Sequence, residues 1–267
     1  MFDLQLWLLG LLPILALALG TWFLSVAKHD VSIVDGLWSL LFLAAACTYA
    51  YLHAEAMPRT ALMLVLVTVW ALRLSLHITH RSWGEPEDRR YQAIRARNEP
   101  GFTWKSLYLV FVLQGVLAWI ISLPLLAAAT SKQTLGGLDT LGVALWLIGF
   151  LYESIADWQL SRFKRKASNR GRVLDSGLWR HTRHPNYFGE FLVWWGFFLT
   201  ALSAGGWWSI LSPLLMSLLL LRVSGVTLLE QDISERRPAY RTYIQRTNAF
   251  FPGPRRAAQV NPKEVQS

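Results

Sequence analysis

The chain has 267 residues, and with 53% apolar and only 16% charged residues it is too apolar for a soluble protein, in which about a quarter of the residues are charged. Its net charge of +9 would suit a nucleic-acid partner, but the basic residues are gathered in a few connections between apolar segments. We therefore interpret the charge as a membrane-orientation signal and expect no nucleic-acid partner.

Seven apolar segments predict membrane-spanning helices, because one crossing of the hydrocarbon core needs about 20 residues. The segments cover approximately residues 4–26, 33–53, 60–80, 104–129, 138–158, 187–203 and 207–229. The predicted fold is all-α, a polytopic bundle of seven transmembrane helices that forms a single domain over residues 1–256. The polar tail, residues 257–267, is predicted to be disordered.

The basic residues indicate the orientation of this bundle. They lie in the connections 81–105 and 162–183, in the tail after Arg236, and at Lys28 in the first connection. Seven crossings place all of these on one side, which the positive-inside rule makes cytoplasmic. The N-terminus is then outside and the C-terminus inside. Arg59 and Lys132 lie in short outer connections, in which we find no obvious chemistry.

The strongest chemical pattern begins inside the fifth apolar segment. Glu153 and Asp157 are four residues apart, so they share one face of a helix. Carboxylates at membrane depth usually face a bundle interior or a water-filled cavity. A purely structural pairing with a basic residue beyond the helix end is the alternative. A basic loop follows, in which Lys164 and Arg172 are among the candidates for phosphate contacts.

The chain then enters the sixth segment with a pattern that predicts an anion site. Pro185 suits a first helical turn, where backbone N–H groups without partners and the helix dipole attract anions. Arg183 and His184 stand immediately before it, and Asn186 and Glu190 could bind sugar hydroxyls or an amide. Contact of the basic residues with anionic lipid headgroups is the alternative, but it does not explain Asn186 and Glu190.

Two other segments carry ionisable residues into apolar surroundings. On the third, Arg73, His77, His80 and Arg81 follow helical spacings and could line a cofactor cavity or relay a proton. Metal binding by the two histidines is the weaker alternative, because no carboxylate is near in sequence, and we predict no metal. On the second, Asp35 is either a buried proton donor or the structural partner of an arginine.

These residues resemble the membrane steroid 5α-reductase family, in particular its bacterial branch known as DUF1295, over nearly the whole chain and most sharply from Glu153 to Trp195. The resemblance implies a seven-helix bundle in the bacterial inner membrane that holds NADPH on its cytoplasmic side. A hydride would pass to an activated C=C bond of a lipophilic substrate that enters from the bilayer. Membrane lipids are the other expected partners, and the sequence carries no signal for an oligomeric state.

The resemblance also implies which residues act. Those implied to line the cofactor site, within a half of the domain from about residue 138 to 250, are Glu153, Asp157, Lys164, Arg172, Asn186, Glu190, Trp194, Arg222 and Glu230. His77, His80 and Arg81 match a His-Tyr-x-His-Arg stretch of the family. We add Arg183, His184 and Tyr187 to the cofactor residues from the anion-site pattern.

The substrate half of the site departs from the family pattern. The tyrosine that donates a hydrogen bond to the substrate carbonyl in the steroid enzymes corresponds to Ile78, and a glutamine of the family corresponds to Val34. Asp35 stands where the steroid enzymes have a substrate-facing glutamate. Asp35 and His77 are therefore the candidate catalytic acids, and the substrate need not be a 3-oxo steroid.

Two other functions compete with reduction. Membrane methyltransferases of the isoprenylcysteine and phospholipid type, which use S-adenosylmethionine, share the Arg-His-Pro-x-Tyr stretch at 183–187. The many Arg and Lys residues of 162–183 favour a dinucleotide, because S-adenosylmethionine offers them only one carboxylate. A non-catalytic lipid-binding or transport protein is the third possibility, but a transporter would typically show repeats and charges at the bilayer midplane.

Overall fold

The structure is a computed structural model, and it describes residues 2–53, 57–223, 225–230, 233 and 238–256. Within these ranges the chain is helical or irregular, with no β-strand, and a parallel bridge joins Thr182 to Asn248. The predicted all-α class is confirmed for this part of the chain. The predicted disordered tail lies outside the described residues.

The chain divides into two compact units. The first comprises residues 1–142 and 197–212, and the second comprises residues 143–196 and 213–267. The single domain expected over residues 1–256 stays a prediction.

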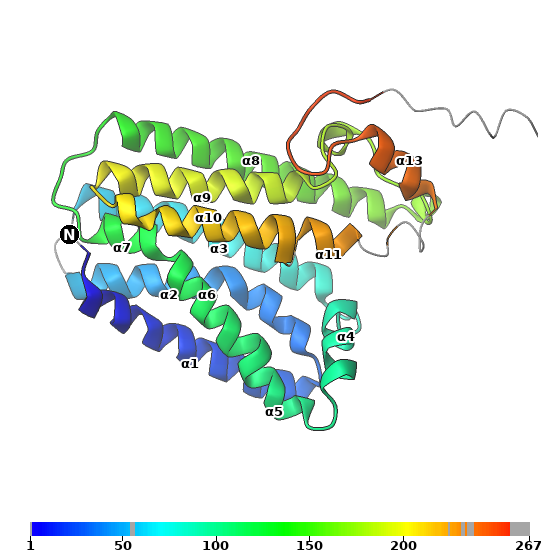
Figure 1. Cartoon of the computed structure of the whole chain (residues 1–267), viewed down its shortest axis with the longest axis horizontal. Helices are drawn as coiled ribbons and strands as arrows, with labels where there is room; N and C mark the ends of the chain where they lie inside the picture. Colours follow the sequence, from blue (N-terminus) through cyan, green and yellow to red (C-terminus); the bar gives the residue numbers. More distant parts are fainter. Residues whose placement is uncertain (1, 54–56, 224, 231–232, 234–237, 257–267) are drawn as a thin grey trace, which may run out of the picture. The chain divides into compact units, whose positions relative to one another are not determined.

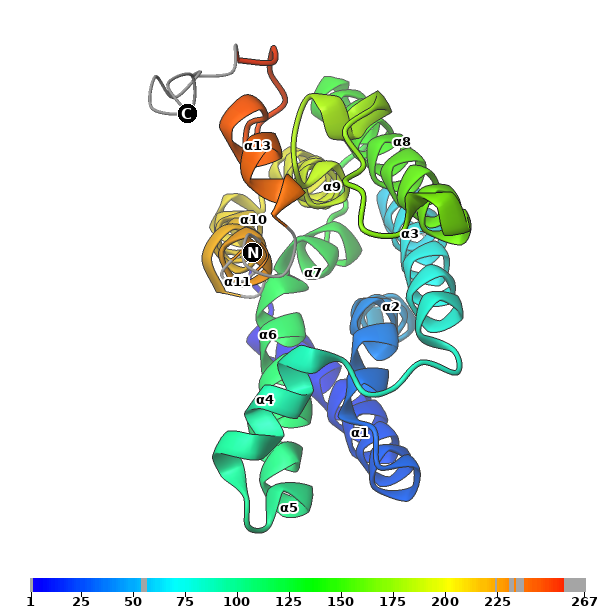
Figure 2. The same ribbon diagram turned by 90° about the vertical axis from the view of Figure 1, so that its right-hand side faces the viewer.

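The first unit is built on three long helices, α1 (Leu4–Lys28), α2 (Val34–His53) and α3 (Pro58–Ser82). The short helix η1 (Val31–Ile33) joins α1 to α2, and Asp30 caps it by accepting a hydrogen bond from the Ser32 backbone N–H. The remaining elements of this part of the chain are α4 (Arg89–Asn98), α5 (Phe102–Ser106), η2 (Leu107–Val112), α6 (Leu113–Ile121) and α7 (Leu123–Ala129). The helix α4 lies near the end of α1 and the start of α2, where Arg90 and Tyr91 contact Asp35, and Figure 2 shows it beside α5 and α6.

The second unit is built around α8 (Gly137–Arg165) and α9 (Pro185–Ser203), which lie side by side in Figure 1. The short helices η3 (Ala167–Asn169) and η4 (Gly177–Arg180) lie in the loop between them. The next element, η5 (Trp207–Ile210), belongs to the first unit, and after it come α10 (Leu211–Leu218), η6 (Leu219–Val223), α11 (Val226–Glu230) and α13 (Ala239–Arg246). As predicted, α9 begins at Pro185.

Five of the helical segments are long and apolar enough to cross a membrane, and they match the first five predicted spans. They are Leu4–Lys28, Val31–His53, Pro58–Ser82, Phe102–Ile121 and Gly137–Arg165. The fourth ends before residue 129 because the helix breaks at Ser122, and Pro124 lacks the N–H group that a continuous helix would use.

The two remaining predicted spans are helical but less suited to crossing. The helix α9 carries Asn186 and Glu190 in its first two turns, and residues 207–223 form a shorter apolar segment divided into 3₁₀, α and π turns. The number of seven crossings and the orientation of the termini stay predictions.

The position of Arg59 differs from the one predicted. Arg59, expected in a plain connection, lies in the first turn of α3 and is fully buried. Its guanidinium donates to both carboxylate oxygens of Asp139, at 2.8 and 2.9 Å, and to Ser131 Oγ at 2.5 Å. The sequence could not reveal this pair, because its members are 80 residues apart.

Candidate functional site

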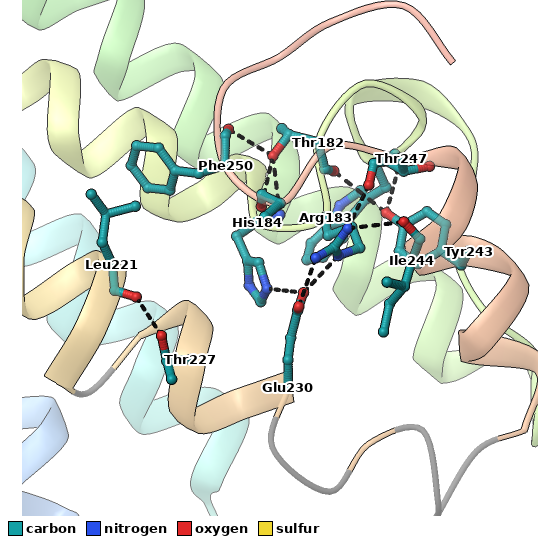
Figure 3. A network of polar contacts seen from close by, with 12 residues as sticks. Thr182, Arg183, His184, Leu221, Thr227, Glu230, Tyr243, Ile244, Thr247 and Phe250 are labelled. Atoms are coloured by element: carbon teal, nitrogen blue, oxygen red, sulfur yellow. Dashed lines mark hydrogen bonds and ion pairs between the residues drawn. The ribbon is translucent and has the colours of Figure 1, made fainter. Parts of the chain in front are cut away.

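The second unit contains a buried ion-pair network centred on Glu230 (Figure 3). The Arg183 guanidinium donates to both oxygens of the Glu230 carboxylate, each at 2.7 Å, and His184 Nε2 lies 2.8 Å from one of them. Arg183 also donates to the carbonyl oxygens of Ile244, at 3.2 Å, and Thr247, at 2.5 Å. The side chains of Arg183 and His184 are 9% and 7% exposed, so the network is largely closed to water.

Backbone contacts explain how the network is assembled from distant parts of the sequence. The Arg183 N–H donates to the Asn248 carbonyl at 2.9 Å, and the Thr182 hydroxyl donates to the Phe250 carbonyl at 2.7 Å. The Tyr243 hydroxyl donates to the Trp179 carbonyl at 2.5 Å. The segment that contains α13 is therefore fastened to the loop that leads into α9.

The partners of Glu230 also set its ionisation. Burial alone would raise the pKa of its carboxyl, but the hydrogen bonds from His184 and Arg183 outweigh burial and hold the pKa at about 2. Glu230 is therefore a carboxylate at neutral pH, and it neutralises the charge of Arg183, which was predicted to lie at an anion site. The geometry gives Arg183 and His184 a positioning role at the start of α9, while their contact with a cofactor stays a prediction.

Three buried carboxylates lie on the two main helices of this unit. Glu153 and Asp157 on α8 are 2% and 5% exposed, and Glu190 on α9 is 8% exposed. The predicted common face of Glu153 and Asp157 is thus confirmed as a buried face. Trp194, one turn after Glu190, is fully buried.

Two glycines bring these helices into backbone contact. A Cβ atom built on Gly189 would lie 2.5 Å from the backbone nitrogen of Glu153, and one built on Gly149 would lie 2.6 Å from the Gly189 carbonyl oxygen. Small residues allow such close approach between helices in membranes. Because Glu190 follows Gly189 directly, the crossing brings the backbones that carry Glu153 and Glu190 together.

The end of α8 and the loop between α8 and α9 carry many basic residues. The exposed ones are Arg162, Lys164 and Arg165 at the end of α8, and Lys166, Arg170, Arg172 and Arg180 in the loop. Asp175 in the same loop pairs with Arg255. Arg162 stacks over the Trp158 ring, 5.3 Å from its centroid. The predicted phosphate ligands Lys164 and Arg172 therefore remain accessible.

The other predicted cofactor residues of this unit are more scattered. Asn186 and Tyr187 are half-buried in the first turn of α9, and the Tyr187 ring stacks on His184 with centroids 5.7 Å apart. Arg222 is exposed in η6.

In the first unit, Asp35 is the centre of a second polar cluster. It lies in the first turn of α2 and accepts hydrogen bonds from Arg90 Nη2, at 2.6 Å, and from the Tyr91 hydroxyl, at 2.5 Å. Of its two predicted roles, the structure shows the pairing with an arginine. The role of Asp35 as a proton donor stays a prediction.

Tyr91 is the residue that the sequence analysis missed in this cluster. Its hydroxyl also accepts a hydrogen bond from Gln114 Nε2 at 3.2 Å, and the residue is 6% exposed. Burial first, and then the charge of Asp35, raise the pKa of Tyr91 well above its usual value. Gln114 lies in α6, which directly follows the π-helix η2, and π-helices are frequent at functional sites. The contact between Tyr91 and Asp35 joins residues 56 positions apart, and no local motif indicates it.

The predicted stripe on the third span is helical throughout, because α3 continues to Ser82. Arg73 and His77 are half-buried, whereas His80 and Arg81 are exposed in the last turns. Among the described residues, no group of three or more His, Cys, Asp and Glu side chains is arranged to hold a metal ion. The catalytic role of His77 and the cofactor roles of His80 and Arg81 stay predictions.

Comparisons with known proteins agree with the resemblance in part. The family model described as "Protein of unknown function (DUF1295)" matches residues 21–247. An uncharacterized protein of Schizosaccharomyces pombe is 27% identical over 91% of this chain and 78% of its own length. No solved structure matches the chain.

Two mammalian enzymes match a shorter part. The protein named 3-oxo-5-alpha-steroid 4-dehydrogenase 1 is 35% identical to this chain in its Bos taurus form and 32% identical in its Mus musculus form. These matches cover 25% and 24% of this chain and 26% of each enzyme.

Proposed function

The chain belongs to the family described as "Protein of unknown function (DUF1295)", and from this membership we propose that it is a membrane-embedded, NADPH-dependent reductase. Its substrate would be a lipophilic molecule with an activated C=C bond, taken from the bilayer of a bacterial inner membrane. The two mammalian relatives are named as dehydrogenases of a 3-oxo steroid, and these names support this class of reaction.

One structural observation carries the proposal. Three carboxylates, Glu153, Asp157 and Glu190, are buried on two helices in backbone contact, and the loop that joins these helices is rich in exposed Arg and Lys. Buried carboxylates at membrane depth are expensive, so a functional use is the default expectation for them.

This set of donors and acceptors fits a dinucleotide. Arg and Lys bind phosphates through charge-assisted hydrogen bonds, and carboxylates accept hydrogen bonds from ribose hydroxyls and from a carboxamide NH₂. Lys164 and Arg172 would bind phosphates, while Asn186 and Glu190 would orient the sugar and amide. NADPH would supply a hydride for one carbon of the C=C bond.

The cluster around Asp35 is our candidate for the polar group of the substrate. The Tyr91 hydroxyl is a neutral donor that could turn from Asp35 to a substrate carbonyl, while Arg90 keeps the carboxylate compensated. Asp35 would then position Tyr91 instead of donating the proton itself. This assignment offers a hydroxyl in place of the tyrosine that Ile78 replaces.

Binding of NADPH tests the cofactor half of the proposal. Purified protein in nanodiscs should quench and shift NADPH fluorescence, with NADP⁺ competing and S-adenosylhomocysteine not competing. Loss of one charge-assisted contact costs about 1.5–3 kcal/mol, so Arg172→Gln and Glu190→Gln should each weaken binding about tenfold or more. Arg241→Gln is the matched control, because Arg241 is exposed on α13 and has no place in the proposed site.

The same titration can reject the proposal. Tight binding of S-adenosylhomocysteine with no response to NADPH would indicate a methyltransferase. Equal losses in Arg172→Gln and Arg241→Gln would show that NADPH binds by general charge attraction and not at the proposed site.

A further inference from the structure

The helix α4 has two chemically different faces. One face carries Tyr91, Ile94 and Arg95 inward, where Tyr91 joins a cluster of buried hydrophobic residues and Arg95 pairs with Glu87 at 2.8 Å. The other face carries Arg89, Gln92, Ala93, Ala96 and Arg97, all of which are exposed. The inward face is accounted for by packing and ion pairing, whereas the outward face has no such explanation.

The position of α4 matches that of a helix at a membrane surface. It lies by the connection between α1 and α2, where Glu87 and Arg90 contact Val31 and Asp35, and both of these helices are long and apolar enough to cross a bilayer. Figure 2 shows α4 beside α5 and α6, which belong to a third such segment. At the end of spans that cross the membrane, α4 lies at the depth of the headgroups, as interfacial amphipathic helices do.

Exposed tryptophans and cations surround this helix. Trp83 and Trp104, which precede and follow α4 in the chain, are 79% and 70% exposed, and tryptophan is enriched where a membrane meets water. The Lys28 ammonium lies 6.0 Å from the centroid of the Trp83 ring. The exposed cations of this region are Lys28, Arg81, Arg89 and Arg97, and the exposed carboxylates are Glu85 and Glu99. The region therefore carries an excess of positive charge.

We propose that the outward face of α4 binds the headgroups of anionic phospholipids. The surface potential of an anionic leaflet attracts juxtamembrane Arg and Lys residues, and the two tryptophans would anchor the segment at the same depth. The proposal does not depend on reductase activity, because it rests on charge and exposure in the first unit alone.

Binding on this face affects the opposite face of the same helix. Arg90 and Tyr91 contact Asp35, and Glu87, just before α4, accepts a hydrogen bond from the Val31 N–H at 2.9 Å. A lipid that holds α4 in its place beside the start of α2 therefore also holds these contacts in place. Anionic lipid would stabilise the Asp35 cluster without touching it.

Hydrogen–deuterium exchange of α4 in nanodiscs tests the proposal. Discs of phosphatidylcholine are compared with discs that contain phosphatidylglycerol, and peptides covering residues 89–98 are followed. We expect exchange to slow at least threefold in the anionic discs. The double variant Arg89→Gln/Arg97→Gln should lose this difference, while Arg89→Lys/Arg97→Lys should keep most of it. Lys132→Gln, a charge change far from α4 in sequence, should behave as the wild type.

Several outcomes would overturn the proposal. Equal exchange of α4 in both discs would mean that its outward face is merely solvated, and protection that persists in Arg89→Gln/Arg97→Gln would exclude these arginines. Protection by inorganic phosphate in phosphatidylcholine discs would indicate a soluble anion instead of a membrane surface. Unchanged exchange of α3 peptides shows that the double variant is folded.

Discussion

Two arginine–aspartate pairs in the first unit differ in how fully the protein satisfies their charges. Arg59 and Asp139 are 0% and 3% exposed, and the arginine has further bonds to two hydroxyls and two backbone carbonyls. Arg90 and Asp35 are 27% and 20% exposed. The first pair is closed and ties the start of α3 to the start of α8, whereas the second is partly open to solvent.

This difference teaches that burial alone does not mark a functional charge. The most deeply buried arginine of the described residues has all its donors satisfied by neighbouring side chains and carbonyls, which is the signature of a structural role. The Asp35 carboxylate of the more open pair also accepts a hydrogen bond from Tyr91, the hydroxyl that we propose exchanges this acceptor for a substrate carbonyl. The following variants test whether the two pairs differ as described.

Removal of the closed pair should have the largest effect. Arg59→Met leaves Asp139 buried without its main partner and should lower the free energy of unfolding by about 3–5 kcal/mol. Denaturation of the detergent-solubilised protein measures this. The double variant Arg59→Met/Asp139→Leu removes both charges and should recover most of the loss. A double variant as unstable as the single one would contradict the account of a closed pair.

The Glu230 network should give an intermediate effect that depends on pH. Its pKa of about 2 lies below the ordinary value of 4.5, so the stabilisation is complete above about pH 4.5 and is lost as the pH falls towards 2. We expect the loss to reach about 2–3 kcal/mol. The difference in thermal midpoint between wild type and Glu230→Gln, measured from pH 7 to pH 3, should shrink with acidity. A constant difference would show that the pKa of Glu230 is the same in the folded and unfolded states, and so contradict its stabilisation by Arg183 and His184.

The open pair should tolerate substitution better than the closed pair. In Asp35→Asn, Arg90 keeps its contact with Asp88 at 2.9 Å and gains access to water, so the loss should be about 1–2 kcal/mol. The same denaturation experiment measures it. A loss as large as that of Arg59→Met would mean that the Asp35 cluster is structural.

The smallest effect is expected at an exposed pair of the second unit. Arg255 contacts Asp175, and their side chains are 28% and 53% exposed. Surface ion pairs contribute about 0–1 kcal/mol, so Arg255→Gln should change stability within that range. A larger loss would show that this contact fastens the C-terminal segment to the loop.

Much of the local structure could be predicted from sequence. Apolar length predicted seven spans, of which five match helices long and apolar enough to cross a membrane. Pro185 predicted the start of α9, and the spacing of Glu153 and Asp157 predicted their common buried face. Each of these depends on residues within a few turns of one another. The DUF1295 family was also recognised correctly over most of the chain.

Contacts between distant residues could not be predicted in the same way. The partners of Arg59, Asp35 and Arg183 lie 80, 55 and 47 residues away. The sequence indicated that these charges needed partners, but not which partners they have. The unforeseen partner matters most for Arg183, because its guanidinium pairs with the Glu230 carboxylate and was predicted to lie at an anion site.

Isotope transfer tests the central claim of a reductase most directly. The protein in nanodiscs is incubated with a membrane lipid extract and NADPH deuterated at C4 on either face, and in parallel with S-adenosylmethionine carrying a labelled methyl group. The account predicts that a lipid gains one deuterium from one form of NADPH and one proton from water, and that Glu190→Gln slows this gain. Transfer of the labelled methyl group, with no deuterium gained, would contradict it.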